Sequence, residues 1–315
     1  MKILVTGATG VIGSRAIPML LAAGHEVTAA SRSAQADARL AQAGATRIAL
    51  DLFDRQAVER VVSGHDAVIN LATHMPKSSF AALQPGAWAQ NDRIRRDASA
   101  CLVEAAIGAG ARLFIQESFA PVYPDCGEAW IGETVPIAPV RYNRTVADAE
   151  QSAQRFTRAG RVGIVLRFAA FYGPDSFQMT DFARALRLGW APIPSRPDAF
   201  LSSVSHDDAA SAVVAALDAP AGAYNVADDE PLRRTEYFGA LAQALGLKAP
   251  RIPPAWTARL FGSIGELLAR SQRMSNGKLR LATRWSPRYR SVREGFPATI
   301  EAMRREGGRP RAEAA

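Results

Sequence analysis

Three glycines lie near the start of the chain, between a short apolar segment and an amphipathic one. The apolar segment is residues 2–6, the glycines are Gly7, Gly10 and Gly13, and residues 11–23 repeat apolar side chains at helical spacing. In a strand–turn–helix unit, the first glycine permits a tight turn and the second lets the backbone approach a pyrophosphate, while the third lets the helix pack on the sheet. Free N–H groups at the start of the helix bind the phosphates. The pattern therefore predicts a dinucleotide-binding site.

The rest of the first half alternates between segments typical of strands and segments typical of helices. Further strands are expected at 25–31, 46–50, 67–71, 113–117 and 162–168, and helices at 34–43, 55–62, 88–109 and 142–159. This order predicts an α/β fold, a Rossmann-type doubly wound parallel sheet. We expect residues 1–173 to form the dinucleotide-binding core. Residues 174–315 form mainly a smaller C-terminal substrate lobe, with helices at 206–217, 235–245 and 256–270, and a segment near 205–226 returns to the core.

Composition argues against several kinds of partner. The net charge is +8, but its 34 arginines and 4 lysines are scattered along the chain, so we expect no nucleic-acid partner. No apolar run is long enough to cross a membrane, and the N-terminus lacks the features of a signal peptide, so a cytoplasmic protein with no membrane contact is expected. The two cysteines have no metal-ligand spacing, and no metal site is predicted. A small-molecule substrate remains as the expected partner.

The end of the second strand bears on the choice of cofactor. An acidic residue there binds the ribose 2′-hydroxyl of NAD, whereas a basic residue accommodates the 2′-phosphate of NADP. This chain has Ser31 and Arg32 at that point and no acid. We therefore predict NADP as the preferred cofactor, with NAD as the alternative.

Several segments together resemble the extended short-chain dehydrogenase/reductases, the NAD-dependent epimerase/dehydratase group. They are Thr6–Gly13, Asp51-Leu52, Asn70-Leu71-Ala72, Asn91, Leu166-Arg167-Phe168 with Tyr172-Gly173-Pro174, Ser205–Ala210 and Tyr224-Asn225-Val226. The resemblance implies a homodimer as one possible assembly. It also implies that the cofactor is bound by Gly7, Thr9, Gly10, Val11, Ile12, Gly13, Ser31, Arg32, Asp51, Leu52, Leu71, Ala72, Thr73, Asn91 and Tyr142.

The catalytic positions depart from the pattern of that family. Its members use a serine or threonine, a tyrosine, and a lysine four residues after the tyrosine, which lowers the tyrosine pKa. Tyr142 takes the tyrosine position, but Val146 stands in place of the lysine, and Phe119 stands at the usual serine position. Ser118 is one residue earlier and would face the other side of a regular strand, unless a bulge turns it back. An unassisted tyrosine has a pKa near 10 and is a poor base at neutral pH.

Three functions stay open at this point. The first is an oxidoreductase for a small carbonyl or alcohol with a non-standard site, in which Tyr142 donates the proton with help from Ser118, His74 or Tyr123. His74 follows the fourth strand, at the sheet edge where such folds bind ligands, and its ordinary pKa suits proton transfer. The second is a sensor that binds NAD(P) without turnover. The third is a divergent nucleotide-sugar epimerase or dehydratase.

Overall fold

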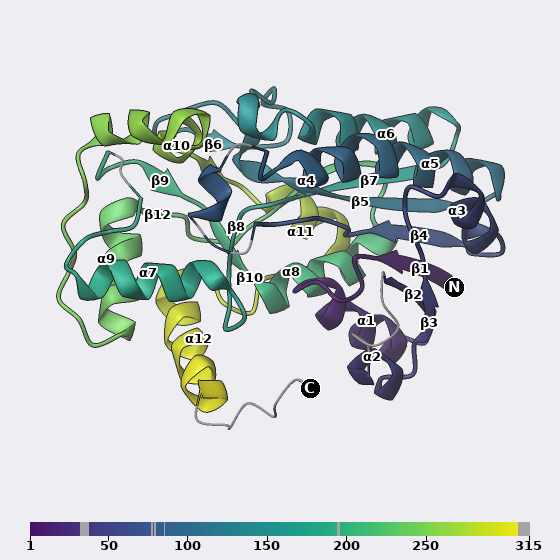
Figure 1. Ribbon diagram of the computed structural model, residues 1–315, viewed down its shortest axis with the longest axis horizontal. Helices are drawn as coiled ribbons and strands as arrows, with labels where there is room; N and C mark the ends of the chain where they lie inside the picture. The colour runs from purple at the N-terminus through teal and green to yellow at the C-terminus, as the bar shows by residue number, and fades with distance from the viewer. Residues whose placement is uncertain (32–37, 77, 79, 85, 194–195, 308–315) are drawn as a thin grey trace.

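A seven-stranded parallel sheet forms the centre of the computed structural model, which describes residues 1–31, 38–76, 78, 80–84, 86–193 and 196–307 (Figure 1). The strand order is β11-β7-β5-β4-β1-β2-β3. This is the predicted doubly wound arrangement, because the chain moves from β1 outward to β3 and then crosses back to β4. The strands are β1 (Lys2–Thr6), β2 (Glu26–Ser31), β3 (Thr46–Ala49), β4 (Ala67–Asn70), β5 (Leu113–Phe119), β7 (Val162–Phe168) and β11 (Gly222–Val226).

Helices cover both faces of this sheet and create two apolar cores. Ile3 and Val5 of β1 belong to one core, and Leu4 between them belongs to the other, as the alternation of a strand requires. The first face packs against α1 (Gly13–Ala22), α8 (His206–Ala215) and α11 (Gly277–Thr283). The second face packs against α3 (Arg55–Val62), α5 (Ser99–Gly108) and α6 (Val146–Arg158). The short helix α2 is Ala38–Gln42.

The helical segment after β4 changes its winding in the middle. The sequence predicts one helix over 88–109, and the structure has α4 (Ala89–Arg93), a π-helical turn at Ile94–Ala98, and then α5. A π-helical turn shifts the side chains that follow it around the helix axis, and such turns are frequent at functional sites. Arg95 lies in this turn and is buried.

The second half adds a smaller group of helices with its own core. Tyr172, Phe238 and Phe296 are fully buried in it, and their rings pack at steep angles against neighbouring aromatics. The helices are α7 (Phe177–Arg187), α9 (Arg234–Ala244), α10 (Gly262–Ala269) and α12 (Val292–Gly307). Short strands link this part to the main sheet in the pairs β8 (Ala170–Tyr172) with β10 (Ser203–Ser205), β9 (Phe200–Leu201) with β12 (Leu232–Arg233), and β6 (Trp130–Ile131) with β13 (Arg273–Met274).

One predicted helix of this lobe is divided. The sequence predicts a single helix over 256–270, whereas residues Ala255–Phe261 form a 3₁₀ segment and α10 starts at Gly262. Gly262 has a φ of 56°, which breaks the helical path and which glycine adopts at little cost.

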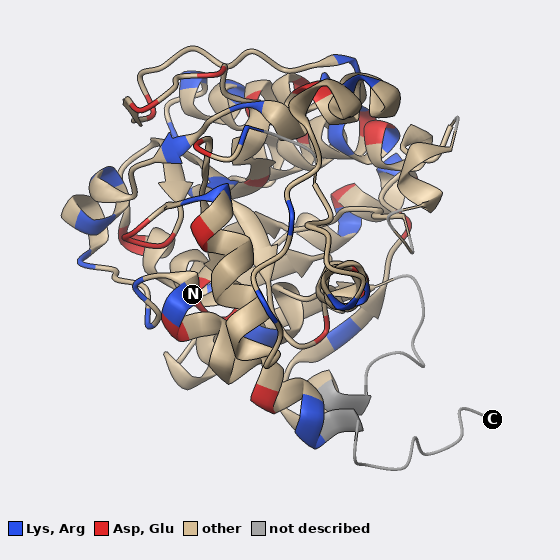
Figure 2. Cartoon of the chain, turned by 90° about the vertical axis from the view of Figure 1, so that its left-hand side faces the viewer, with Lys and Arg blue, Asp and Glu red and all other residues tan. Residues whose placement is uncertain are grey.

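The charged residues of both signs are interspersed over the face shown in Figure 2. Many arginines are paired with acids; Arg15, for example, contacts Asp175 at 2.7 Å and Asp207 at 2.8 Å. Within the described part of the chain, no helix is both long enough and apolar enough to span a membrane.

Candidate functional site

A continuous cleft opens at the carboxyl ends of β1, β4 and β5. It consists of two cavities that share Gly7, Gly10, Leu71, Thr73 and Met75. One extends toward the ends of β2 and β3, and the other extends into the C-terminal lobe. The carboxyl edge of a parallel sheet, at the point where strand order reverses, is where folds of this kind bind ligands.

The glycine loop fits a bound dinucleotide. Gly7 has a φ of 68°, and a Cβ atom there would lie 2.4 Å from the backbone of Leu71. At Gly13 a Cβ would lie 2.4 Å from the carbonyl oxygen of Gly7, so these two glycines hold the loop against its surroundings. Gly10 is exposed and lines both cavities, so its backbone is open to a ligand. No side chain caps the start of α1. The Ser14 and Arg15 N–H groups donate to the carbonyl oxygens of Gly10 and Ile12, so the N–H groups just before them, at Val11, Ile12 and Gly13, are the ones placed for phosphate oxygens.

The cavity beside β2 and β3 contains most of the other predicted cofactor positions. Its lining includes Thr9, Ser31, Asp51, Leu52, Leu71, Ala72, Thr73 and His74. The carboxylate of Asp51 accepts a hydrogen bond from the Phe53 N–H at 3.0 Å, which closes the turn after β3. Arg32, the predicted 2′-phosphate ligand, lies outside the described residues.

Two asparagines shape the loop after β4. The Asn70 Oδ1 atom accepts from the Thr6 hydroxyl at 2.6 Å and from the Ala72 N–H at 3.3 Å, which joins the ends of β1 and β4. Asn91 is almost fully buried, and its Oδ1 accepts the His74 N–H at 3.0 Å. Asn91 therefore supports the loop and is not among the described residues that line either cavity.

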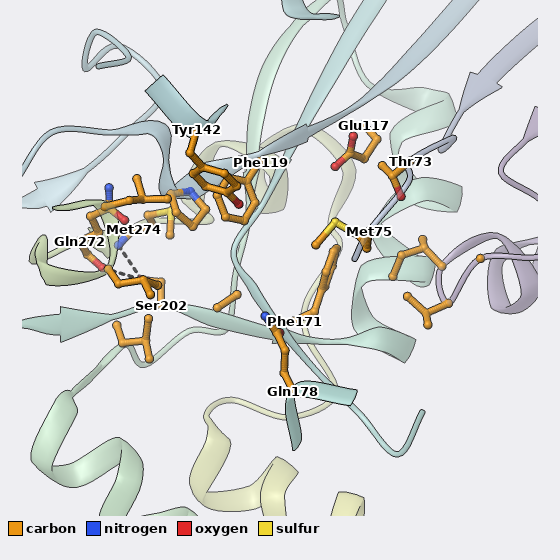
Figure 3. A pocket seen from close by; sticks show the side chains of 18 of the residues that line it. Thr73, Met75, Glu117, Phe119, Tyr142, Phe171, Gln178, Ser202, Gln272 and Met274 are labelled. Carbon is orange, nitrogen blue, oxygen red and sulfur yellow. Dashed lines mark hydrogen bonds between the residues drawn. The ribbon is translucent and has the colours of Figure 1, made fainter. Parts of the chain in front are cut away.

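The second cavity is mainly apolar, and Tyr142 lies on its wall. Figure 3 shows Thr73, Met75 and Glu117 toward one end and Ser202, Gln272 and Met274 toward the other, with Tyr142 and Phe119 between them. Further apolar lining comes from Leu71, Trp88, Pro121, Ala170, Phe171, Phe182, Ile193, Leu201, Leu267 and Leu268.

Tyr142 is held by packing and not by hydrogen bonds. Its ring meets that of Trp88 edge to face, with 4.6 Å between centroids, and within the described residues its hydroxyl has no hydrogen-bond partner. Burial raises the pKa of Tyr142 to about 12; the cation of Arg95 opposes this shift, and Glu117 and Asp92 add to it. Val146, at the family's lysine position, is fully buried at the start of α6. Tyr142 is therefore a neutral phenol at physiological pH, with its hydroxyl free for a ligand.

Ser118 is turned away from the cleft. β5 pairs with β7 in unbroken register from Leu113 to Phe119, so no bulge reverses its alternation. Phe119 and Glu117 face the cavity, and the Ser118 hydroxyl donates to Glu150 on α6 at 2.7 Å. This geometry does not support the expectation that Ser118 acts on a substrate.

The group that Ser118 joins is a buried polar network between β5, β7 and α6. Arg167 donates two hydrogen bonds to Glu150, at 2.8 and 2.7 Å, and one to the Tyr123 hydroxyl at 2.7 Å. Tyr123 in turn donates to Asn225 at 2.7 Å. Because each charge in the network has a partner, its residues stabilise the sheet end that carries Tyr123 and Phe119.

His74 lies on the cofactor side of the cleft. It lines the cavity with Ser31 and Asp51, and among the described lining residues it is absent from the apolar cavity where Tyr142 lies. Among the described residues no hydrogen bond joins His74 to Tyr142, so the geometry does not support the expectation that the two act together.

Three charged residues that line the apolar cavity, Arg95, Glu117 and Arg234, were not predicted from the sequence, and the first two form a pair. Arg95 Nη2 lies 3.6 Å from Glu117 Oε1, and both side chains are about nine-tenths buried. Burial raises the pKa of the Glu117 carboxyl, against the effect of Arg95. The alternation of β5 was a signal for Glu117, because it lies two residues before Phe119, whereas the placement of Arg95 depends on the π-helical turn.

Comparisons with known proteins agree with this architecture. The sequence model of the NAD dependent epimerase/dehydratase family matches residues 3–227. A 3-diazoavenalumate denitrifying reductase from a Streptomyces species is 34% identical over 307 residues, covering 94% of this chain and 99% of that protein. A 2-alkyl-3-oxoalkanoate reductase from Stenotrophomonas maltophilia is 28% identical, covering 86% of this chain and 83% of that protein.

Solved structures of similar fold contain either form of the cofactor. The UDP-glucose 4-epimerase of Thermus thermophilus, in complex with NAD, superposes with a TM-score of 0.76 at 26% identity, over 96% of this chain and 99% of that one. The human epimerase family protein SDR39U1, with NADPH, gives 0.75 at 19% identity, over 96% and 99%. The chain belongs to the NAD-dependent epimerase/dehydratase family, whose members include reductases and epimerases.

Proposed function

We propose that this protein is an NAD(P)H-dependent reductase that transfers hydride to a small, largely apolar substrate, with Tyr142 as the proton donor. The observation that carries the proposal is the position of Tyr142. Its hydroxyl, which has no hydrogen-bond partner among the described residues, lies in an apolar cavity that continues directly from the glycine loop. The family membership and the similarity along the whole chain to a reductase support the same class of reaction.

The protonation state of Tyr142 suits the reductive direction of the reaction. A bound reduced nicotinamide supplies a hydride to an electrophilic carbon, and the carbonyl oxygen then needs a proton to become a hydroxyl. The pKa of Tyr142 is about 12, so the phenol carries that proton at neutral pH and can donate it. The apolar lining around Tyr142 excludes water from the reacting atoms.

The same property argues against an epimerase or dehydratase. Those reactions require a base that removes a proton from an alcohol, and only the phenolate form of a tyrosine can do this. Val146 offers no charge to stabilise a phenolate, and Arg95 does not outweigh the effect of burial on the pKa.

We further propose NADP(H) as the preferred cofactor. Ser31 lines the cavity at the end of β2, and the sequence there contains no acidic residue that would select the NAD ribose. Thermal-shift titration with NADPH and with NADH measures this preference directly. A larger stabilisation by NADH at equal concentration would overturn it.

A second reductive reaction is favoured by the absence of the lysine. The relative with 34% identity is named a denitrifying reductase, and replacement of a diazonium nitrogen by hydride releases N₂ and consumes no proton. Such a substrate would need the cofactor and an apolar cavity but no proton donor. The two candidates therefore differ in what they require of Tyr142.

Tyr142→Phe tests the proposal and separates the candidates. We expect the variant to bind NADPH as the wild type does, and to reduce carbonyl substrates roughly 10²- to 10⁴-fold more slowly, the usual contribution of a positioned acid. NADPH oxidation is followed at 340 nm with a panel of aryl and alkyl ketones and aldehydes, and with stabilised arenediazonium salts against a protein-free control. Unchanged carbonyl turnover in the variant would remove Tyr142 from the mechanism. If Tyr142→Phe reduces the diazonium salts as fast as the wild type does, the second candidate is favoured.

A further inference from the structure

The described residues include three arginines that are almost completely buried, and one of them has no acidic partner. Arg167 is paired with Glu150 at 2.7 Å, and Arg95 is paired with Glu117 at 3.6 Å. Arg234, at 2% exposure the most buried of the three, has no carboxylate within 4 Å in the described part of the chain. A buried charge without a counter-ion is costly, so an unpaired one needs an explanation.

The polar atoms of Arg234 are mostly unused. Its Nη2 donates to the carbonyl oxygen of Arg270 at 3.0 Å, but its Nε and Nη1 have no hydrogen-bond partner among the described residues. Asp125, a carboxylate that acts on Arg234 at longer range, is already paired with Arg196 at 3.1 Å. Burial lowers the pKa of Arg234 to about 10, so the guanidinium is still charged at neutral pH. Two donors of a buried cation are thus left without a partner in the described part of the chain.

Arg234 lines the apolar cavity in which Tyr142 lies. It is the first residue of α9, directly after β12, and β12 pairs with β9, which leads into Ser202. Its backbone N–H donates to Ala199 at 2.9 Å, which fixes the start of the helix beside that strand. Figure 3 shows Ser202 at the end of the cavity away from Thr73, which adjoins the cofactor loop. The cation therefore belongs to the lobe end of the cavity.

We propose that Arg234 binds a carboxylate of the substrate, so that the substrate is an acid with an apolar body. A guanidinium presents two parallel N–H groups to a carboxylate, which makes the pair both strong and directional. The surroundings favour a carboxylate over a phosphate ester. Phe182, Ile193, Leu267 and Leu268 line the same cavity and offer no donors for a second negative charge. Two polar groups at that end are already engaged, because the Ser202 hydroxyl donates to the Gln272 carbonyl oxygen at 3.0 Å and Gln272 Nε2 donates to the Tyr123 carbonyl oxygen at 2.6 Å.

This inference rests on the proposed reductase function, because the carboxylate site would orient a substrate between Arg234 and the nicotinamide. The acid group would bind at the lobe end, and the reducible carbon would lie near Tyr142. Arg234 is then a specificity-determining residue, and it takes no part in proton or hydride transfer.

Binding measurements with matched pairs of ligands test the proposal. Protein saturated with NADP⁺ is titrated by calorimetry with cinnamate and cinnamamide, and with hexanoate and hexanamide; each pair differs in charge but hardly in shape. We expect at least one acid to bind the wild type 10-fold or more tightly than its amide. Arg234→Met should abolish the difference, and Arg234→Lys should keep part of it. Arg233→Met is the matched control, because Arg233 is paired with Glu128 and is not among the described residues lining the cavity, and it should leave the preference unchanged.

Two outcomes would overturn the inference. One is that the wild type binds neither acid more tightly than its amide, or binds none of the probes. The other is that folded Arg234→Met still binds an acid more tightly than its amide. If Arg234→Met fails to fold, the wild-type comparison and Arg234→Lys still decide. These titrations do not depend on turnover. If the protein prefers the acid but never oxidises NADPH, the reductase proposal is contradicted and the anion site is still supported.

Discussion

The cofactor side and the substrate side of the cleft are built from different kinds of group. On the cofactor side, the essential features belong to the backbone: a glycine at φ 68°, an uncapped helix start and loops that approach within contact distance. On the substrate side, the essential features belong to side chains, with an apolar lining interrupted by Tyr142, the Arg95–Glu117 pair and Arg234.

The difference explains why one side follows the family pattern and the other does not. A backbone cradle tolerates few changes, because any side chain at Gly7 or Gly13 collides with main-chain atoms. A side-chain site can exchange one group for another without altering the fold. Here the Ser118 hydroxyl serves a buried network and Val146 fills the core, and the charged groups of the cavity come from other elements.

The largest effect that we expect on cofactor binding comes from Gly7→Ala. The added Cβ would meet Leu71 at 2.4 Å in a backbone conformation that favours glycine, so the loop must move and its N–H groups lose their alignment. Strain of about 3 kcal/mol corresponds to a roughly 100-fold weaker affinity. Titration calorimetry with NADPH measures the change.

Gly24→Ala is the matched control for this prediction. Gly24 also has a positive φ, 81°, but a Cβ there would have no atom within 4 Å. We expect a loss of stability of about 1 kcal/mol from the backbone conformation alone, with unchanged NADPH affinity. If the two variants weakened NADPH binding equally, close backbone contact would not be what defines the cofactor side.

A smaller effect, on stability, is expected from Ser118→Ala. The hydroxyl donates to a buried carboxylate, so its loss should lower the free energy of unfolding by about 1.5–3 kcal/mol, as measured by urea denaturation. The rate of hydride transfer should stay within about twofold of the wild type, because Ser118 faces α6. Tyr142→Phe should give the opposite result, with near-normal stability and a large loss of carbonyl turnover. If Ser118→Ala instead slowed turnover by roughly the factor expected for Tyr142→Phe, Ser118 would have to be assigned to the active site.

The sequence alone predicted the strands of the sheet, because the apolar pattern that indicates each strand lies within that strand. The alternation of apolar strands with helices fixes which segments enter the sheet, and the carboxyl-edge position of the cleft follows from the parallel arrangement. The prediction of one helix over 256–270 was wrong in its first half, since apolar periodicity does not show that Gly262 adopts a positive φ. The α7 helix was not predicted.

The substrate side was harder to predict for a physical reason. Glu117, Arg95 and Arg234 come from three separate elements, and each would be an ordinary surface charge by sequence alone. Their burial depends on a π-helical turn for Arg95 and on the packing of the C-terminal lobe for Arg234. Strand alternation, by contrast, correctly indicated that Ser118 would face away from Phe119.

The smallest expected effect is an absence of pH dependence, and it tests the substrate side most directly. The proton donor is the neutral form of Tyr142, which is lost only as pH rises through its pKa of about 12. With saturating NADPH and substrate, the turnover rate for carbonyl reduction should therefore stay level from about pH 7 to 10. A tyrosine whose pKa is lowered by a neighbouring lysine would lose its proton within that range. Glu117→Gln sharpens the test: it removes an anion that raises the Tyr142 pKa, so any alkaline fall in turnover should begin at a lower pH than in the wild type. A wild-type midpoint between about pH 7 and 9 would mean that another cation acts on Tyr142 in the bound complex, and that the substrate side resembles the family's site more closely than its residues indicate.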